Sequence, residues 1–131
     1  MQTYVKTLYH VVFSTKYRTR CIDDEMLNQI SFFINEKLIE LNVRCYILNG
    51  YLDHVHLLIS IPPHLSVSEV VRQIKGYSSF YIPGFSWQKG YAVFTVDELS
   101  FERILNYIKK QKEHHRGNAL YRRLLIDNQG F

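Results

Sequence analysis

With 131 residues, 47% of them hydrophobic, the chain is long enough for one globular domain and too apolar for a disordered one. It carries a net charge of +4, and none of its apolar runs approaches the roughly 20 residues of a membrane span, so we expect no membrane partner. The N-terminus has no signal-peptide pattern, and Cys21 and Cys45 suggest no disulfide framework. These features predict a single domain over residues 1–131, with a C-terminal tail from about 117 to 131, in a reduced cytoplasm.

The first third of the chain predicts a strand followed by an amphipathic helix. Residues 8–14 are mostly β-branched or aromatic, which favours a strand. Asp23 and Asp24 are typical N-cap residues, and the helix that they begin is expected to run to about Leu41. Its apolar side chains recur at helical spacing: Met26, Leu27, Ile30, Phe33, Ile34, Leu38 and Leu41.

The middle of the chain predicts a β-hairpin. Residues 43–48 form the second expected strand, and a third covers about 51–60, where a double proline ends it. Both residues of Asn49-Gly50 accept positive φ, so this pair is expected to form the hairpin turn.

The remaining elements complete an α+β topology. Ser66 or Ser68 can cap a second helix, residues 90–96 predict a fourth strand, and Ser100 can cap a last helix that runs to about Arg116. The order β-α-β-β-α-β is that of the ferredoxin-like fold, an antiparallel sheet with two helices. The last helix is appended to this unit at the C-terminal end.

The third expected strand carries two histidines, His54 and His56, on either side of Val55. Because side chains alternate along a strand, the two imidazoles point to the same face of the sheet. Buried polar groups need partners, so this pair predicts half of a metal site and calls for a third ligand. On the opposite face, Val55, Leu57 and Ile59 are expected to pack beneath the first two helices. The histidines would then face a substrate or the last helix.

The last helix offers side chains for such a site. Its apolar stripe predicts the side that packs on the sheet: Phe101, Ile104, Leu105 and Ile108. Tyr107 and Gln111 are four residues apart, on one flank of this stripe, at the boundary between packed and solvated surface. Taken alone, a tyrosine or a glutamine in that place is far more often a packing residue than a catalytic one. Their combination with His54 and His56 in so short a chain favours a joint site.

The positive charge is concentrated at the C-terminal end. Residues 1–108 contain ten basic and ten acidic side chains, whereas residues 109–131 contain six basic and two acidic ones. A second basic cluster, Lys16, Arg18 and Arg20, follows the first strand, and Tyr17 lies among these residues. Cations for phosphates and rings for unstacked bases favour a nucleic acid as partner. Basic side chains are also common at the end of an ordinary solvated helix.

Two motifs resemble those of a known family. Asp53-His54-Val55-His56-Leu57-Leu58 is similar to the His-hydrophobic-His motif of the HUH endonucleases. Tyr107-Ile108-Lys109-Lys110-Gln111, followed by Glu113-His114-His115, resembles the nucleophile helix of their smallest branch. That branch is the single-tyrosine transposases of bacterial insertion sequences that move as single-stranded DNA. The resemblance covers nearly the whole chain and includes residues 10–16, 74–76 and 87–91.

This resemblance implies a metal-dependent DNA transposase. His54, His56 and Gln111 would bind a divalent metal, Mg²⁺ or Mn²⁺, and Tyr107 would be the nucleophile on the appended helix. Ligand softness alone would also allow Zn²⁺ for two imidazoles. The enzyme would cut and rejoin single-stranded DNA through a 5′-phosphotyrosine intermediate at the hairpin-bearing ends of an insertion sequence, in the bacterial cytoplasm.

The same resemblance implies two kinds of partner. Single-stranded DNA with hairpin ends is the expected substrate. A homodimer is also expected, in which the tyrosine helix of one subunit completes the histidine site of the other. Seven basic side chains are the candidates for phosphate contacts: Lys16, Arg18, Arg20, Lys75, Arg116, Arg122 and Arg123.

Two other functions are compatible with parts of the sequence. A ferredoxin-like sheet with exposed aromatic residues could bind RNA in the manner of an RRM. However, the chain has no RNP-like aromatic pattern, and RNA binding gives His54, His56 and Gln111 no joint role. The other alternative is a non-catalytic domain that binds DNA or a metal, or that oligomerises, such as a domesticated transposase.

Three further polar residues have simpler predicted places. His10 is expected to face the core or DNA, and His64, after the double proline, to lie in a surface loop. Asp53 is expected to point to the other face of the histidine strand and not to act as a ligand.

Overall fold

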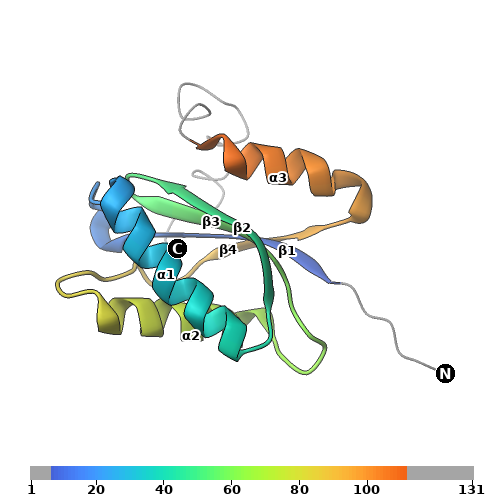
Figure 1. Cartoon of the computed structure of the whole chain (residues 1–131), viewed down its shortest axis with the longest axis horizontal. Coiled ribbons are helices and arrows are strands. Elements are labelled where there is room, and N and C mark those ends of the chain that lie inside the picture. The colour runs from blue at the N-terminus through green and yellow to red at the C-terminus, as the bar shows by residue number, and fades with distance from the viewer. Residues whose placement is uncertain (1–6, 112–131) are drawn as a thin grey trace.

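The computed structural model describes residues 7–111, which form a four-stranded antiparallel sheet with helices on both faces (Figure 1). The elements are β1 (Leu8–Ser14), η1 (Lys16–Arg18), α1 (Asp24–Glu40), β2 (Arg44–Tyr51), β3 (His54–Ser60), α2 (Val67–Tyr81), β4 (Ala92–Val96), η2 (Glu98–Ser100) and α3 (Phe101–Lys109). The strand order β2-β3-β1-β4 confirms the predicted ferredoxin-like fold with one appended helix. None of the helices in this part of the chain is long and apolar enough to cross a membrane.

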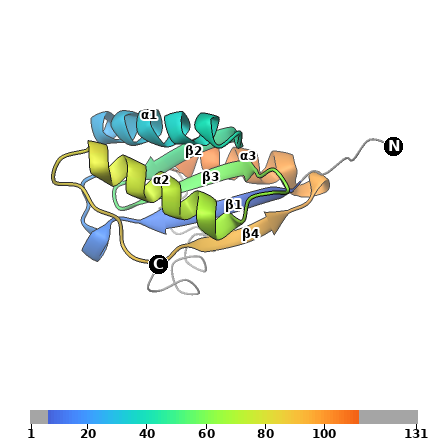
Figure 2. The same cartoon turned by 90° about the horizontal axis from the view of Figure 1, so that it is seen from below.

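The sheet separates two hydrophobic clusters of different size. Helices α1 and α2 cover one face, and α3 lies across the other (Figures 1 and 2). Beneath α1 and α2, Val55, Leu57 and Ile59 of β3 are fully buried in the main core, as predicted. The smaller cluster under α3 has four buried members: Leu58, Ile104, Tyr107 and Ile108. Each fully buried aliphatic side chain contributes about 1.5–3 kcal/mol, so most of the folding energy comes from the α1 and α2 side.

The first two helices begin where capping chemistry predicts. The carboxylate of Asp23 accepts a hydrogen bond from the backbone N–H of Met26 at 2.8 Å, which starts α1. The hydroxyl of Ser66 accepts from the N–H of Glu69 at 3.1 Å and starts α2 in the same way. These two caps place both helices on the main core.

The hairpin turn between β2 and β3 lies three residues later than predicted. Tyr51 pairs with His54, so the turn consists of Leu52 and Asp53, and Leu52 takes the left-handed conformation with φ 56°. Asn49-Gly50 instead lies within β2. A Cβ atom at Gly50 would lie 2.7 Å from the carbonyl oxygen of His54, so glycine is required there for close packing and not for a turn.

Helix α3 begins where it was predicted to begin, at Phe101, but not through the predicted cap. Ser100 makes no side-chain cap; the Asp97 carboxylate accepts from the Ser100 N–H at 2.8 Å and begins η2, which leads into α3. At the other end Lys110 leaves helical geometry, with φ −104° and ψ 30°, and α3 ends at Lys109. The predicted continuation to Arg116 and the predicted tail at 117–131 lie outside the described residues.

Candidate active site

His54 and His56 lie side by side on the face of the sheet that α3 covers. Both side chains are fully buried, and their ring centroids are 5.0 Å apart. β3 is an inner strand that pairs with both β1 and β2, so the backbone under the two imidazoles is held on both sides. The predicted placement of the histidines opposite the main core is confirmed.

Asp53 fixes the orientation of His54. The prediction that Asp53 points to the other face of the strand is wrong, because Asp53 lies in the turn and not in β3. From there its Oδ1 is 2.8 Å from Nδ1 of His54. The guanidinium of Arg18 approaches the other carboxylate oxygen at 4.0 Å. Since Nδ1 of His54 is bound to Asp53, a metal would be bound through Nε2.

His10 is a third histidine in the site, and the sequence did not predict it there. Its Nε2 is 2.8 Å from Nδ1 of His56, and the His10 side chain is buried. Burial lowers the pKa of His10 to about 4, so its ring is neutral at pH 7. His10 therefore does face the interior, one of its two predicted places, but it faces the candidate site and not the main core.

Tyr107 is buried against these imidazoles. Its ring centroid is 5.8 Å from that of His56 and 6.2 Å from that of His10. Its side chain is only 6% exposed, so the predicted boundary position is wrong: α3 lies flat on the sheet and covers this flank as well. Burial raises the pKa of the Tyr107 hydroxyl, and the Gln111 side chain opposes that rise. The hydroxyl is protonated at neutral pH.

Gln111 places an amide oxygen in the same buried region. Its side chain is fully buried, and its Nε2 donates a hydrogen bond to the backbone carbonyl oxygen of Tyr107 at 3.2 Å. Its Oε1 is a buried acceptor that no donor of the described chain satisfies, and such an atom suits a cation. Among residues 7–111 no group of three or more His, Cys, Asp or Glu side chains could hold a metal.

Asn49 holds the end of the tyrosine helix. Its Nδ2 donates hydrogen bonds to the carbonyl oxygens of Ile108 and Lys109 at 3.0 and 3.2 Å, groups that a helix C-terminus leaves without intrahelical donors. Asn49 pairs with His56 in the β2–β3 ladder. The same register therefore places the helix end next to the histidines, and sequence analysis had assigned Asn49 only to the turn.

Four of the seven candidate phosphate contacts lie in the described part of the chain. Lys16 and Arg20 are exposed, whereas Lys75 is half-buried and its ammonium donates to the carbonyl oxygens of Gln88 and Gly90 at 2.7 and 2.8 Å. Burial lowers the pKa of Lys75. A hollow of about 440 Å³ lies beside this cluster and is lined by Lys16, Tyr17, Lys75, Gly76, Ser79, Ser86, Trp87, Gln88 and Lys89. The candidates outside the described residues are Arg116, Arg122 and Arg123.

Residues 3–111 match the model of the IS200-like transposases. The chain belongs to the IS200-like transposase family. This transposase is 32% identical over 117 residues to the transposase of the insertion sequence IS200 from Salmonella typhimurium, an alignment that covers 80% of this chain and 76% of that protein. It is 24% identical over 117 residues to the ISDra2 transposase TnpA of Deinococcus radiodurans, with 80% and 84% covered.

Solved structures share the fold of this transposase. A crystal structure of a candidate transposase from Deinococcus radiodurans R1 superposes with a TM-score of 0.66 at 27% identity and covers 85% of this chain and 95% of that one. A REP-associated tyrosine transposase bound to a REP hairpin superposes with a TM-score of 0.68 at 13% identity, over 88% and 73% of the two chains. The resemblance to the single-tyrosine HUH transposases is thereby confirmed, and DNA transposition is the class of activity.

Proposed function

We propose that this transposase cuts and rejoins single-stranded DNA through a covalent bond to Tyr107, beside a divalent metal held by His54, His56 and Gln111. The observation that carries the proposal is the convergence of these four side chains on one buried face of the sheet. The rings of His54 and Tyr107 lie 5.0 and 5.8 Å from that of His56. Packing alone gives no reason to gather imidazoles, a phenol and an amide in one apolar cluster.

The ligand set supports a divalent cation. Two neutral imidazole nitrogens and a neutral amide oxygen leave the positive charge of the ion uncompensated, which suits an anionic DNA substrate. A bound cation would stabilise charge on the non-bridging oxygens of the scissile phosphate and orient it. The choice of Mg²⁺ or Mn²⁺ rests on the family, because imidazole ligands would also suit Zn²⁺.

Tyr107 supplies the nucleophile. Its phenolic oxygen forms a bond to phosphorus, the bond from phosphorus to the 3′-oxygen breaks, and the phenolic proton is lost as the 3′-hydroxyl gains one. The resulting 5′-phosphotyrosine keeps a diester-like bond. Attack by another 3′-hydroxyl can therefore reseal DNA and release the phenol without nucleotide hydrolysis, as a transposase requires.

The turn after β1 is well placed to guide the DNA strand to this site. Ser14 pairs with His54, and the backbone N–H of Thr15 donates to the carbonyl oxygen of Asp53 at 2.8 Å. The next residues, Lys16 and Tyr17, are exposed, and Tyr17 is 82% exposed with its backbone in the left-handed region at φ 60°. An exposed ring beside a cation suits an unstacked base and its phosphate.

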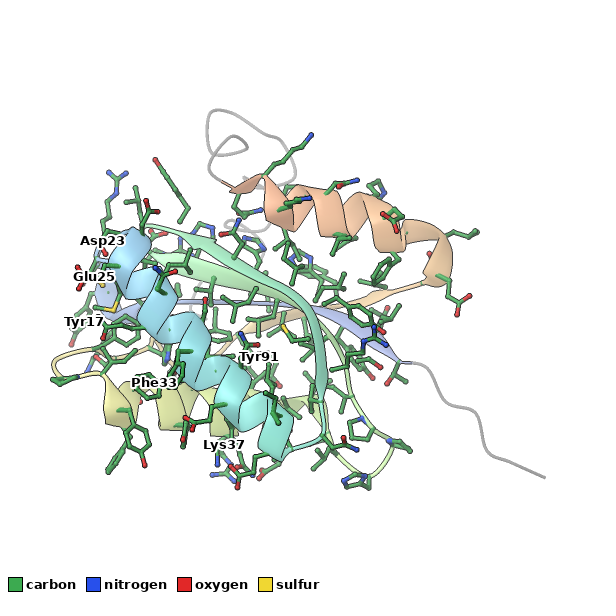
Figure 3. The ribbon with its side chains drawn as sticks, in the orientation of Figure 1. Tyr17, Asp23, Glu25, Phe33, Lys37 and Tyr91 are labelled. Carbon is green, nitrogen blue, oxygen red and sulfur yellow. The ribbon has the colours of Figure 1, made fainter. Side chains whose placement is uncertain are left out.

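Replacement of Lys16 by glutamine is expected to weaken single-stranded DNA binding and to lower the slope of log K against log salt by about one. Lys37→Gln is the matched control. Lys37 lies near the C-terminal end of α1, far from Tyr17 (Figure 3), and its ammonium is paired with the Glu40 carboxylate at 2.7 Å. Fluorescence anisotropy with a labelled single strand at several salt concentrations measures both slopes. Equal slopes of log K against log salt in the two variants would show that Lys16 does not contact the DNA strand.

The homodimer with exchanged tyrosine helices is part of the proposal. In the described chain α3 lies on its own sheet, so exchange requires α3 to leave it. The small cluster beneath α3 supports this, because a helix held by Leu58, Ile104, Tyr107 and Ile108 opens at lower cost than one on the main core.

Mixed dimers test this exchange. After subunit exchange, Tyr107→Phe chains and His54→Ala, His56→Ala chains, each inactive alone, should together recover about a quarter of the wild-type adduct. That figure follows because about half of the dimers are mixed and each mixed dimer has one complete site. Adduct yield on a denaturing gel is the measurement. No recovery, with mixed dimers verified by two affinity tags, would show that each site is built within one chain.

The decisive experiment for the function as a whole uses single-stranded oligonucleotides from the flanks of this gene, with Mg²⁺ or Mn²⁺. A protein–DNA adduct that survives SDS and requires the metal is the expected result. Tight DNA binding without any adduct would instead identify a non-catalytic DNA-binding protein.

A further inference from the structure

We propose that His10 is a positioning residue that sets the tautomer of His56, and that His56 can bind a metal through Nε2 because of it. The inference rests on the proposed function, since it gives His56 a role as ligand. The family match and the sequence motifs do not single out His10 for any role.

Backbone register brings His10 to His56. In the β1–β3 ladder His10 pairs with Leu58, and Val12 pairs with His56. His10 and His56 are thus diagonal neighbours on the face that α3 covers, within reach of large side chains. The two rings are inclined by 26°, with centroids 5.0 Å apart, and are joined by the 2.8 Å contact from Nε2 of His10 to Nδ1 of His56.

The tautomer follows from what a metal ligand needs. An imidazole that binds a metal through Nε2 must present a lone pair there, so a neutral His56 must carry its proton on Nδ1. That N–H points at Nε2 of His10, which must then accept the hydrogen bond, and the proton of His10 resides on its Nδ1. With its own proton on Nδ1, His10 accepts from His56 as the Asp53 carboxylate, at 2.8 Å from Nδ1, accepts from His54; unlike the carboxylate, the imidazole acts as acceptor only in that tautomer.

The ring of His10 also packs against aromatic side chains. A packing role for His10 and a hydrogen-bonding role can therefore be distinguished by two different substitutions. It contacts the ring of Phe94 at 5.8 Å and that of Tyr107 at 6.2 Å. His10→Phe keeps an aromatic ring against both neighbours and removes the acceptor. His10→Gln keeps an acceptor and removes the ring. If His10 acts by packing, His10→Phe should disturb the site less than His10→Gln does. If it acts by hydrogen bonding, His10→Gln should disturb the site less than His10→Phe does.

The first experiment measures the tautomer of His56 in the metal-free full chain by long-range ¹⁵N–¹H NMR correlation. The signal of His56 is assigned by its loss in His56→Gln. In the wild type we expect the proton of His56 on Nδ1. His10→Phe should move most of it to Nε2, the nitrogen that free imidazoles prefer, and His10→Gln should keep it on Nδ1. An unchanged tautomer in His10→Phe would overturn the proposal.

The second experiment measures Mn²⁺ affinity without DNA, by electron paramagnetic resonance of free Mn²⁺. Loss of an orienting partner typically weakens metal binding by about 10- to 100-fold. We expect such a loss for His10→Phe, near-recovery for His10→Gln and no change for His64→Phe, a control in the exposed loop where His64 was predicted to lie. Weaker Mn²⁺ binding by His10→Gln than by His10→Phe would show a packing role and overturn the proposal. A wild type that binds no Mn²⁺ would instead overturn the metal site of the proposed function, while the tautomer result would still judge His10.

Discussion

Replacement of Tyr107 by phenylalanine is expected to reduce formation of the covalent DNA adduct to background while leaving the fold and DNA binding nearly intact. The change removes only the hydroxyl oxygen that forms the bond to phosphorus. The ring stays in its cluster beneath α3 with Leu58 and Ile104. Loss of one buried hydroxyl typically lowers the free energy of unfolding by about 0.5–1.5 kcal/mol. Adduct yield on a denaturing gel and hairpin affinity by anisotropy are the two measurements.

Tyr46 provides the matched control for this variant. It lies on β2, packs on the same cluster, and its ring is 5.0 Å from that of Phe101 at the start of α3. Tyr46→Phe should therefore form the adduct at the wild-type rate. If Tyr107→Phe still forms the adduct, another side chain is the nucleophile, and the role proposed for α3 is wrong.

Replacement of His56 by alanine is expected to abolish metal-dependent cleavage. A bound cation supplies several kcal/mol of transition-state stabilisation, and each 1.4 kcal/mol is a factor of ten, so a loss of at least about a hundredfold is expected. The substitution also leaves Nε2 of His10 without its partner in a buried position, which should cost about 1–3 kcal/mol of stability. Cleavage rates across buffered Mg²⁺ and Mn²⁺ concentrations are compared well below the melting temperature of the variant.

His64→Ala is the control for this experiment, because it removes an exposed imidazole and leaves the buried cluster intact. It should cleave DNA as the wild type does. Equal cleavage rates for His56→Ala and wild type, at the same free metal concentration, would show that no metal acts at His54, His56 and Gln111.

Local patterns in the sequence predicted most of the fold, and they failed where tertiary pairing decides the outcome. Asp23 and Ser66 cap helices through contacts three residues away, which spacing alone reveals. Asn49-Gly50 has a strong preference for a turn, yet the ladder between β2 and β3 continues through it, and the turn falls on Leu52 and Asp53. Pairing of the three further β2 residues, up to Tyr51, with β3 outweighs that local preference.

Local patterns likewise predicted part of the candidate site and missed the contacts that depend on strand pairing. Alternation along one strand places His54 and His56 together, and helical spacing places Tyr107 near Gln111. His10 was not predicted to lie in the site, because its contact with His56 depends on the register of β1 against β3, which no local sequence pattern specifies. Asp53 was misplaced because its contact with His54 depends on where the turn falls.

The sheet keeps its main core on one face and its reactive groups on the other, and this arrangement shapes how the chain can evolve. The Gln111 side chain is fully buried and its Oε1 has no donor in the described chain, so an apolar side chain of similar size there would be expected to leave the fold as stable or more so. An inactivating substitution of this amide in a gene copy would then meet no resistance from folding. Only selection for mobility would maintain Gln111, and a copy relieved of that selection would drift into an inert but well-folded descendant.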